Sequence, residues 1–248
     1  MSIGRGVPTG VRALSQQGHH TQPLQPLRTH RIPNMDPQLK QACQELLATE
    51  RQYLLDLREF SSIFIAAFHR DLPSLRVSAA TAETLGQSLG HWDQIELFHG
   101  ELLATLEGTC GREGVVGPGT PELLAAVFAS HAPYLKMYSE FIALYTPAAA
   151  ALQREAAERP AFRAWLTAFQ QGSPRRLGAL DYLIKPVQRI CKYPLLFREI
   201  GRHMRKASGG GFDHLVDDGA DDEAYMSVVL CLSAIEDAVR HVNSNQDM

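Results

Sequence analysis

The chain has 248 residues, of which 45% are hydrophobic and 21% are charged, and these fractions are typical of soluble globular proteins. This length fits a single core of about 200 residues with loose ends better than two large domains. The formal net charge of -3 argues against nucleic acid as the main ligand, and the apolar runs are shorter than the roughly 20 residues that a membrane span requires.

The amino-terminal segment, residues 1–35, contains His, Gln, Pro, Gly and Thr without sustained periodicity. We expect a disordered lead-in here, and it lacks the apolar stretch of a secretory signal. The cysteines of the chain form no C-x-x-C pair, which indicates neither a zinc site nor a disulfide framework. Reduced thiols suit an intracellular, cytoplasmic protein.

The first predicted helix begins at Asp36, where an N-cap residue is followed by Pro37. Apolar residues recur with helical period from Leu39 to Phe68. A helix over residues 36–70 would be on the order of 50 Å long at 1.5 Å per residue. It is too long to be buried by itself, so partner helices must lie alongside it.

Further helical patterns follow in order along the chain. Ser78 caps a predicted second helix that reaches Leu106, and Pro121 opens a third that ends or kinks near Pro147. Helices are also predicted from Pro160, over residues 177–206, and at the carboxyl end. No strand pattern and no repeat of fixed period compete with this interpretation. The sequence therefore predicts an all-α fold, an elongated irregular bundle of about six helices.

Glu50 lies in the middle of the apolar stripe of the first helix, between Leu46 and Leu57. A carboxylate at such a position requires an explanation. One interpretation is that Glu50 pairs with an arginine or reaches solvent near one end of the bundle. The other is that the bundle leaves this face uncovered, so that Glu50 meets hydrogen-bond donors of a partner.

A basic stripe runs along the helix at residues 177–206. It comprises Lys185, Gln188, Arg189, Lys192 and His203, opposite an apolar side with Val187, Cys191, Pro194 and Leu195. We expect the stripe to face away from the core, either as a solvated face or as a binding surface, and Leu195 to be buried. Asn243 near the carboxyl end is interpreted as a helix cap or as a further polar contact.

Three sequence blocks resemble those of Dbl-homology domains, the modules that exchange guanine nucleotides on Rho-family GTPases. LDYLIKPVQRICKYPLLFREI, from Leu180, resembles the third and most specific block; ELLATERQYLLDLREF, from Glu45, resembles the first, and HAPYLKMYSEFIALY, from His131, the second. The resemblance covers about residues 36–246. No strand-rich continuation follows, so the pleckstrin-homology domain that usually accompanies these modules is expected to be absent from this chain.

The resemblance implies a GTPase-binding function without covalent chemistry, metal or cofactor. It implies that Glu50 engages switch I, that Lys192 and Asn243 contact switch II, and that Tyr53, Gln188 and Arg189 lie beside them. Ile184, next to Lys185, matches a position that packs between the switches, which favours a Rac or Rho subgroup partner. The implied GTPase-binding residues are Glu50, Tyr53, Ile184, Lys185, Gln188, Arg189, Lys192 and Asn243.

Two other classes of function were weighed against exchange. A helical scaffold or adaptor that kept the fold without the activity would lack the switch-contacting residues, and Glu50, Lys192 and Asn243 are all present. A hydrolase or metalloenzyme finds little support, because H-E-x-x-H does not occur. Recruitment to the membrane periphery would depend on regions outside this chain.

Overall fold

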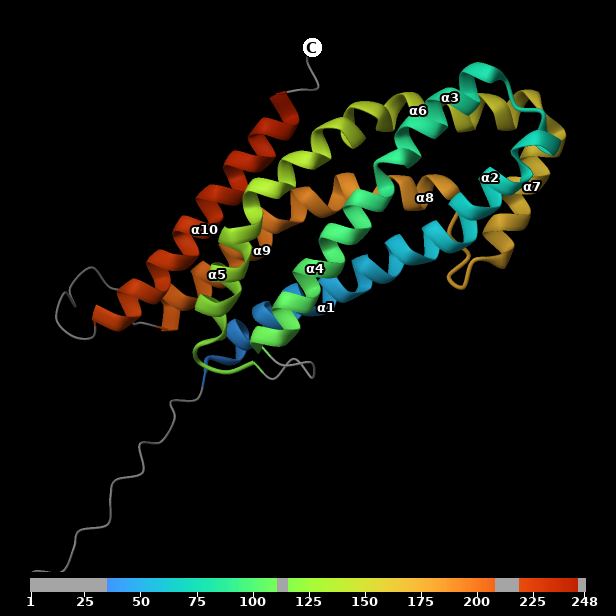
Figure 1. The fold of residues 1–248 in the computed structure, drawn as a ribbon. Coiled ribbons are helices and arrows are strands. Elements are labelled where there is room, and N and C mark those ends of the chain that lie inside the picture. The colour runs from blue at the N-terminus through green and yellow to red at the C-terminus, as the bar shows by residue number, and fades with distance from the viewer. Residues whose placement is uncertain (1–34, 111–115, 208–218, 245–248) are drawn as a thin grey trace, which may run out of the picture. The chain divides into compact units, whose positions relative to one another are not determined.

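The computed structural model describes residues 35–110, 116–207 and 219–244, and for residues 207 and 219–222 the backbone alone. All elements in these ranges are helical, and they form six successive segments (Figure 1). The first three are α1 (Pro37–Phe60), a π-helical turn (Ser61–Ile65) and α2 (Ala66–Leu75); α3 (Ala79–Gly90) and α4 (Trp92–Cys110); and α5 (Thr120–His131), a 3-10 turn (Ala132–Met137) and α6 (Tyr138–Glu158). The others are α7 (Pro160–Gly172), α8 (Ala179–Leu183) with α9 (Lys185–Ala207), and α10 (Gly219–Ser244). The predicted all-α bundle is confirmed, whereas the predicted lead-in lies outside the described residues except for Met35.

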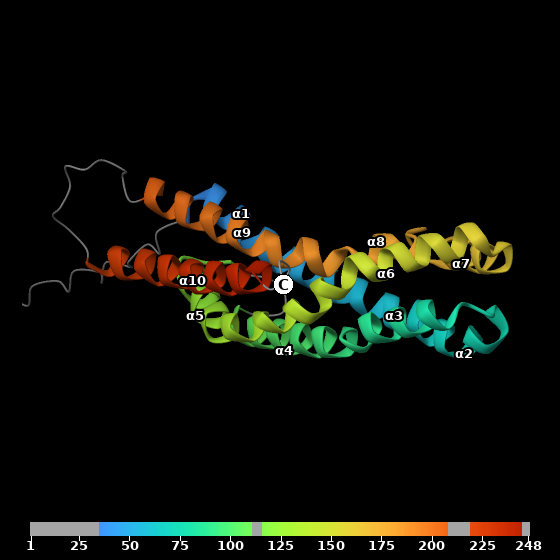
Figure 2. The same ribbon diagram turned by 90° about the horizontal axis from the view of Figure 1, so that it is seen from above.

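The helices of residues 35–244 pack side by side along one long direction (Figures 1 and 2). α1 contacts both α9 and α4, and α3 packs on α6. α5, α9 and α10 gather at one end, while α2 and α7 lie toward the other. Since α1 and α9 are neighbours, the first and third sequence blocks lie together in space.

Local capping explains where several helices begin. The Asp36 side chain accepts hydrogen bonds from the backbone N–H groups of Gln38 and Leu39 at 2.9 and 3.0 Å. Ser78 Oγ accepts one from Thr81 N–H at 3.2 Å. Each bond satisfies a donor that the first helical turn leaves without an intrahelical partner. Both predicted caps are therefore confirmed.

Two predicted boundaries are wrong. The expected second helix is interrupted between Gly90 and Trp92, where the helix-weakening Gly90 ends α3. Pro147 does not end α6, which continues to Glu158. Pro147 and Ala143 are exposed, so water can reach the carbonyl that proline leaves without its usual donor.

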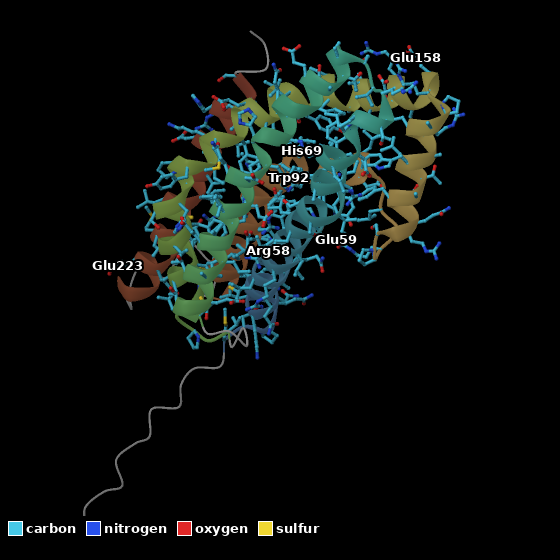
Figure 3. All side chains as sticks on the ribbon, turned by 45° about the vertical axis from the view of Figure 1, so that its right-hand side comes forward. Arg58, Glu59, His69, Trp92, Glu158 and Glu223 are labelled. Carbon is cyan, nitrogen blue, oxygen red and sulfur yellow. The ribbon has the colours of Figure 1, made fainter. Side chains whose placement is uncertain are left out.

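An aromatic cluster joins α1, α4 and α8 in the core. The Phe60 ring lies 4.6 Å from the Phe64 and Trp92 rings and 5.2 Å from Tyr182, measured between centroids. Trp92 is fully buried, and its indole N–H donates to the carbonyl of Leu57 at 3.1 Å (Figure 3). Burying each such ring contributes about 1.5–3 kcal/mol. The cluster thus fixes α1 against the segment that leads into α9.

Among the described helices, none is both long and apolar enough to cross a bilayer.

Candidate functional site

A cavity of about 240 Å³ opens between α1 and α9, with one further wall from Arg175. It is lined by Thr49, Gln52, Tyr53, Asp56, Arg175, Lys185, Gln188, Arg189 and Lys192. Five of these residues, Tyr53, Lys185, Gln188, Arg189 and Lys192, belong to the predicted site. The structure therefore brings residues of the first and third blocks together around one cavity.

Glu50 lies beneath this cavity and is 0% exposed. Its Oε1 accepts from His99 Nδ1 at 2.6 Å, and its Oε2 accepts from Tyr193 Oη at 2.7 Å and from Arg189 Nη2 and Nε at 2.5 and 3.2 Å. A carboxylate has about four acceptor sites, and these donors fill them. The prediction that Glu50 stands uncovered toward a partner is therefore wrong; the alternative, pairing with an arginine, is what the structure contains.

The surroundings of Glu50 stabilise its ionised form. Burial by itself would raise the pKa of this carboxyl group. The interactions with His99 and Arg189 and the hydrogen bonds from His99 and Tyr193 outweigh burial, and they lower the pKa to about 2. Glu50 thus remains an anion that holds Arg189, His99 and Tyr193 in one cluster. We call these four residues the anchor.

Two tyrosines extend the anchor into the core. His99 Nε2 lies 2.6 Å from the Tyr138 hydroxyl oxygen, which lies 3.0 Å from that of Tyr53. Burial raises the pKa of both tyrosines well above the usual value, so each hydroxyl keeps its proton for a hydrogen bond. The polar chain connects α1, α4, α6 and α9, and Tyr53, although predicted to lie at the partner surface, is buried within it.

Arg189 belongs to the interior as well, with 4% of its surface exposed. Its Nη1 donates to Thr49 Oγ1 at 2.9 Å, and its guanidinium lies 4.6 Å from the centroid of the Tyr193 ring. The prediction that the basic stripe faces away from the core is wrong at this residue. His203, predicted on the same exposed side, is also buried.

Asp56 organises the floor of the cavity. Lys185 Nζ lies 2.7 Å from its Oδ2, and Gln52 Nε2 donates to its Oδ1 at 2.8 Å. Arg175, in the loop between α7 and α8, pairs with the same carboxylate. Neither Asp56 nor Arg175 was identified from the sequence. The two residues are 119 positions apart, and residue types alone do not reveal that they pair.

The outer edge of the cavity is open to solvent at Gln188 and Lys192. Within the described part of the chain, Lys192 forms no ion pair. Leu195, one turn further along α9, is 59% exposed. We call Gln188, Lys192 and Leu195 the rim.

The exposure of Leu195 and of Cys191 shows that the predicted apolar side of this helix is wrong at these two residues, whereas Pro194 is buried and Val187 packs against the core as expected. The buried face of α9 instead comprises Ile190, Tyr193, Phe197 and Ile200. The anchor explains the difference, because Glu50 neutralises Arg189 and allows it to turn inward.

The two remaining predicted residues lie away from the cavity lining. Ile184 is half-buried at the junction of α8 and α9, and Asn243 is exposed in the last turn of α10. Arg198 Nη2 and Glu236 Oε1, 2.6 Å apart, join α9 to α10. Asn243 follows Glu236 by two helical turns, so both are on the side of α10 that faces α9.

No group of three or more His, Cys, Asp or Glu side chains within the described ranges could hold a metal ion. The cavity instead presents hydrogen-bond donors, a free ammonium and an adjacent leucine. Such a surface is suited to binding another macromolecule.

Comparison with known sequences gives one family. A family model described as the RhoGEF domain matches residues 42–243. The chain is 29% identical over 224 residues to Pleckstrin homology domain-containing family G member 2 of Mus musculus, and 26% identical over 235 residues to Rho guanine nucleotide exchange factor TIAM2 of the same organism. These alignments cover 88% and 92% of this chain but only 15% and 12% of those proteins. The chain thus spans a small part of the length of these relatives.

Solved structures share the fold. The DH/PH domains of PDZ-RhoGEF, determined in complex with activated RhoA, match with a TM-score of 0.66 and 18% identity over 85% of this chain and 54% of that chain. A mutant of the DH/PH domains of p115-RhoGEF matches with a TM-score of 0.65 and 22% identity over 84% of this chain and 55% of that chain.

Proposed function

The chain belongs to the RhoGEF domain family, and from this premise we propose that it accelerates the release of guanine nucleotide from a Rho-family small GTPase. The family match over residues 42–243 supports the activity, as does the name of the relative TIAM2, a Rho guanine nucleotide exchange factor. The observation that carries the proposal is the rim itself. Lys192, which forms no ion pair with any described residue, and the exposed Leu195 lie on a helix that a buried ion pair fixes in place.

The proposed contact surface centres on the rim and extends to α10. Lys192 would donate to an acceptor on the GTPase switch II segment, and Leu195 would pack on an apolar patch of the same partner. Asn243, on the side of α10 that faces α9, would add a hydrogen bond. Gln188 would contribute a donor and an acceptor at the mouth of the cavity.

Glu50 has a different part in this proposal. Its acceptor sites are already used, so it acts through Arg189 and Tyr193, which it holds in place on α9. The partner therefore meets a pre-organised helix and need not order flexible side chains as it binds. Pre-organisation of this kind lowers the entropic cost of association.

Exchange follows from preferential binding and needs no covalent step. A ligand that binds two states of a protein equally does not change the equilibrium between them. To promote GDP release, this chain must therefore bind the nucleotide-free GTPase more tightly than the GDP-bound form. Each tenfold gain in the release rate requires about 1.4 kcal/mol of such preference. Incoming nucleotide then expels the domain by the same linkage.

The proposed partner is a GTPase of the Rac or Rho subgroup. Ile184 is half-buried where α8 meets α9, one residue before Lys185. A β-branched side chain has a restricted χ1 angle and so presents a fixed shape to an aromatic side chain of the GTPase that packs against it. Ile184 would therefore fit a tryptophan and a phenylalanine on the partner differently.

The test is the release of fluorescent GDP from purified Rac, Rho and related GTPases with and without this chain. We expect release to accelerate at least tenfold for one or more of them and to rise with the concentration of the chain. A catalytically silent scaffold would bind without accelerating release, and that result across the panel would overturn the proposal.

A further inference from the structure

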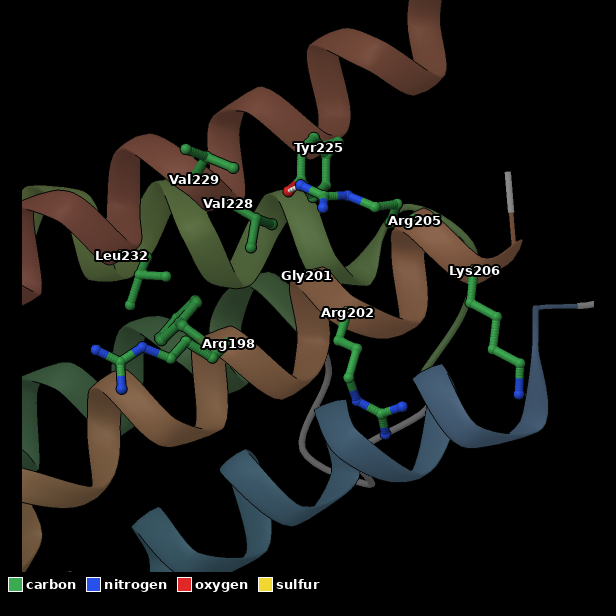
Figure 4. A pocket seen from close by; sticks show the side chains of 10 residues that line it. Arg198, Gly201, Arg202, Arg205, Lys206, Tyr225, Val228, Val229 and Leu232 are labelled. Atoms are coloured by element: carbon green, nitrogen blue, oxygen red, sulfur yellow. Dashed lines mark hydrogen bonds between the residues drawn. The ribbon is translucent and has the colours of Figure 1, made fainter. Parts of the chain in front are cut away.

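A second cavity, of about 470 Å³, lies between the later part of α9 and the first turns of α10 (Figure 4). The contacts of Arg198 with Glu236 and of Arg205 with Tyr225 show that the two helices run antiparallel. Its lining residues are Phe197, Arg198, Gly201, Arg202, Arg205, Lys206, Tyr225, Val228, Val229 and Leu232. This groove combines an apolar floor with cationic side chains, and among the described residues that line it there is no carboxylate.

The floor of the groove is apolar, and a glycine lies in its middle. Val228, Val229 and Leu232 of α10 face α9 across the groove (Figure 4). Gly201 lies opposite them; a Cβ atom there would stand 3.7 Å from Tyr225 and Val228, an ordinary contact distance. The absence of a side chain at Gly201 therefore keeps the middle of the groove open.

A cation stands at each end of this floor. Arg198 and Arg205 are seven residues apart on α9, which places them on one face and about 10 Å apart along the axis. Arg198 pairs with Glu236, whereas Arg205 has no carboxylate partner among the described residues. Arg202 and Lys206 also line the groove, but their side chains extend toward α1 (Figure 4).

Arg205 is already held in a binding geometry. Its guanidinium lies 5.0 Å from the centroid of the Tyr225 ring and donates a hydrogen bond to the Tyr225 hydroxyl. A guanidinium has five N–H donors, so donors remain for an incoming carboxylate. Little side-chain entropy is lost when a cation that is already stacked binds an anion.

We propose that this groove binds an acidic amphipathic helix of a partner protein. Two acidic residues seven positions apart on such a helix match the two arginines, and apolar residues three and four positions along point to the floor between them. The described lining residues carry positive charge and no carboxylate, which makes this part of the groove complementary to that charge pattern.

The geometry favours a helix over a membrane or a second copy of this chain. A lipid surface is met by cations on a convex face, whereas here the apolar residues lie at the bottom of a groove. Self-association would need an acidic helix of this chain with the same spacing of charges. Lys192 lies 13 residues before Arg205, about 20 Å along α9, so the Arg205 end of the groove is well separated from Lys192.

The test uses a fluorescein-labelled synthetic helix with two glutamates seven residues apart and leucines at the third and fourth positions after the first. We expect saturable binding in fluorescence anisotropy, and binding at least tenfold weaker when glutamine replaces both glutamates. Arg205→Glu should weaken binding at least tenfold, while Arg154→Glu, an exposed arginine on α6, should leave it unchanged.

Two further experiments make the test more specific: one exchanges the charges of the peptide and the groove, and the other fills the groove with a larger side chain. A peptide with lysine in place of the glutamate that meets Arg205 should bind Arg205→Glu better than it binds the wild-type chain. Gly201→Leu should weaken binding of the original peptide by filling the floor. The melting curve of each variant, followed by circular dichroism, should match that of the wild type, and so should its rate of GDP release.

Several results would overturn the proposal. These are the absence of saturable peptide binding, equal binding of the glutamine peptide, and equal effects of Arg205→Glu and Arg154→Glu. Phosphatidylserine vesicles that bind in an Arg205-dependent manner while the peptide does not would assign the groove to a membrane surface. A dimer in sedimentation that Arg205→Glu dissociates would assign it to a second copy of this chain.

Discussion

The anchor and the rim lie on the same turns of α9 and are built in opposite ways. Arg189 is buried, neutralised by Glu50 and stacked on Tyr193, whereas Lys192, three residues later, is exposed and unpaired within the described residues. Burial and pairing make Arg189 important for stability, and exposure leaves Lys192 free for a partner. Two basic residues of one sequence block therefore lie in opposite environments, and we propose that only Lys192 contacts the partner.

The largest effect is expected from breaking the anchor. Glu50→Ala leaves a buried arginine and a buried histidine without their acceptor, so we expect a loss of about 3–5 kcal/mol in the free energy of unfolding. Urea unfolding followed by circular dichroism measures it. Glu45→Ala, an exposed glutamate on the same helix, is the matched control. A Glu50→Ala variant as stable as this control would contradict the buried, paired position of Glu50.

A pair of variants on one helix separates its two faces. Phe197→Ala opens a cavity in the core and should reduce the free energy of unfolding by about 3–5 kcal/mol. Leu195→Ala removes an exposed side chain, so its effect should stay within about 0.5 kcal/mol. GDP release should nevertheless slow with Leu195→Ala. Comparable losses of stability for both variants would contradict the assignment of these faces.

Acid should weaken the anchor in a defined direction. The pKa of Glu50 is lowered in the folded chain to about 2, below its usual value of about 4.3. A lowered folded-state pKa contributes stability above the unfolded-state value, and that stability is lost as the pH falls from about 4.3 toward 2. In unfolding curves over this range, Glu50→Gln should lose less stability than the wild type. Equal losses of stability in the wild type and in Glu50→Gln would show that ionised Glu50 does not stabilise the folded chain.

The rim should control activity without controlling stability. Lys192→Ala removes the free ammonium, and we expect GDP release to slow at least tenfold, equivalent to about 1.4 kcal/mol. Its urea midpoint should equal that of the wild type. Lys136→Ala, an exposed lysine elsewhere, should change neither quantity. A Lys192→Ala variant that exchanges at the wild-type rate would remove this residue from the site.

The smallest expected effect concerns the choice of partner. Ile184→Leu moves one methyl group, which is worth about 1–3 kcal/mol at best. We expect a shift of less than tenfold in the ratio of release rates between two GTPases that differ only by tryptophan or phenylalanine opposite Ile184. Identical ratios for wild type and variant would show that Ile184 does not distinguish these two residues.

The helices and most of their starts could be predicted, because capping and apolar spacing are local properties. Asp36 and Ser78 cap helices as expected, and Glu50 was recognisable as a charge within an apolar stripe. The inward turn of Arg189 was not predictable in this way. The buried position of Arg189 depends on a carboxylate 139 positions away, and helical spacing groups Arg189 with the other basic residues of its helix. His99 was missed for the same reason.

The most direct test of the account compares the affinity of this chain for one responsive GTPase in its nucleotide-free and GDP-bound forms. Biolayer interferometry with the immobilised chain measures both dissociation constants. Exchange by preferential binding predicts that the nucleotide-free form binds at least tenfold more tightly, and that Lys192→Ala weakens this complex more than the complex with the GDP-bound form. Equal affinities for the two forms would contradict the account.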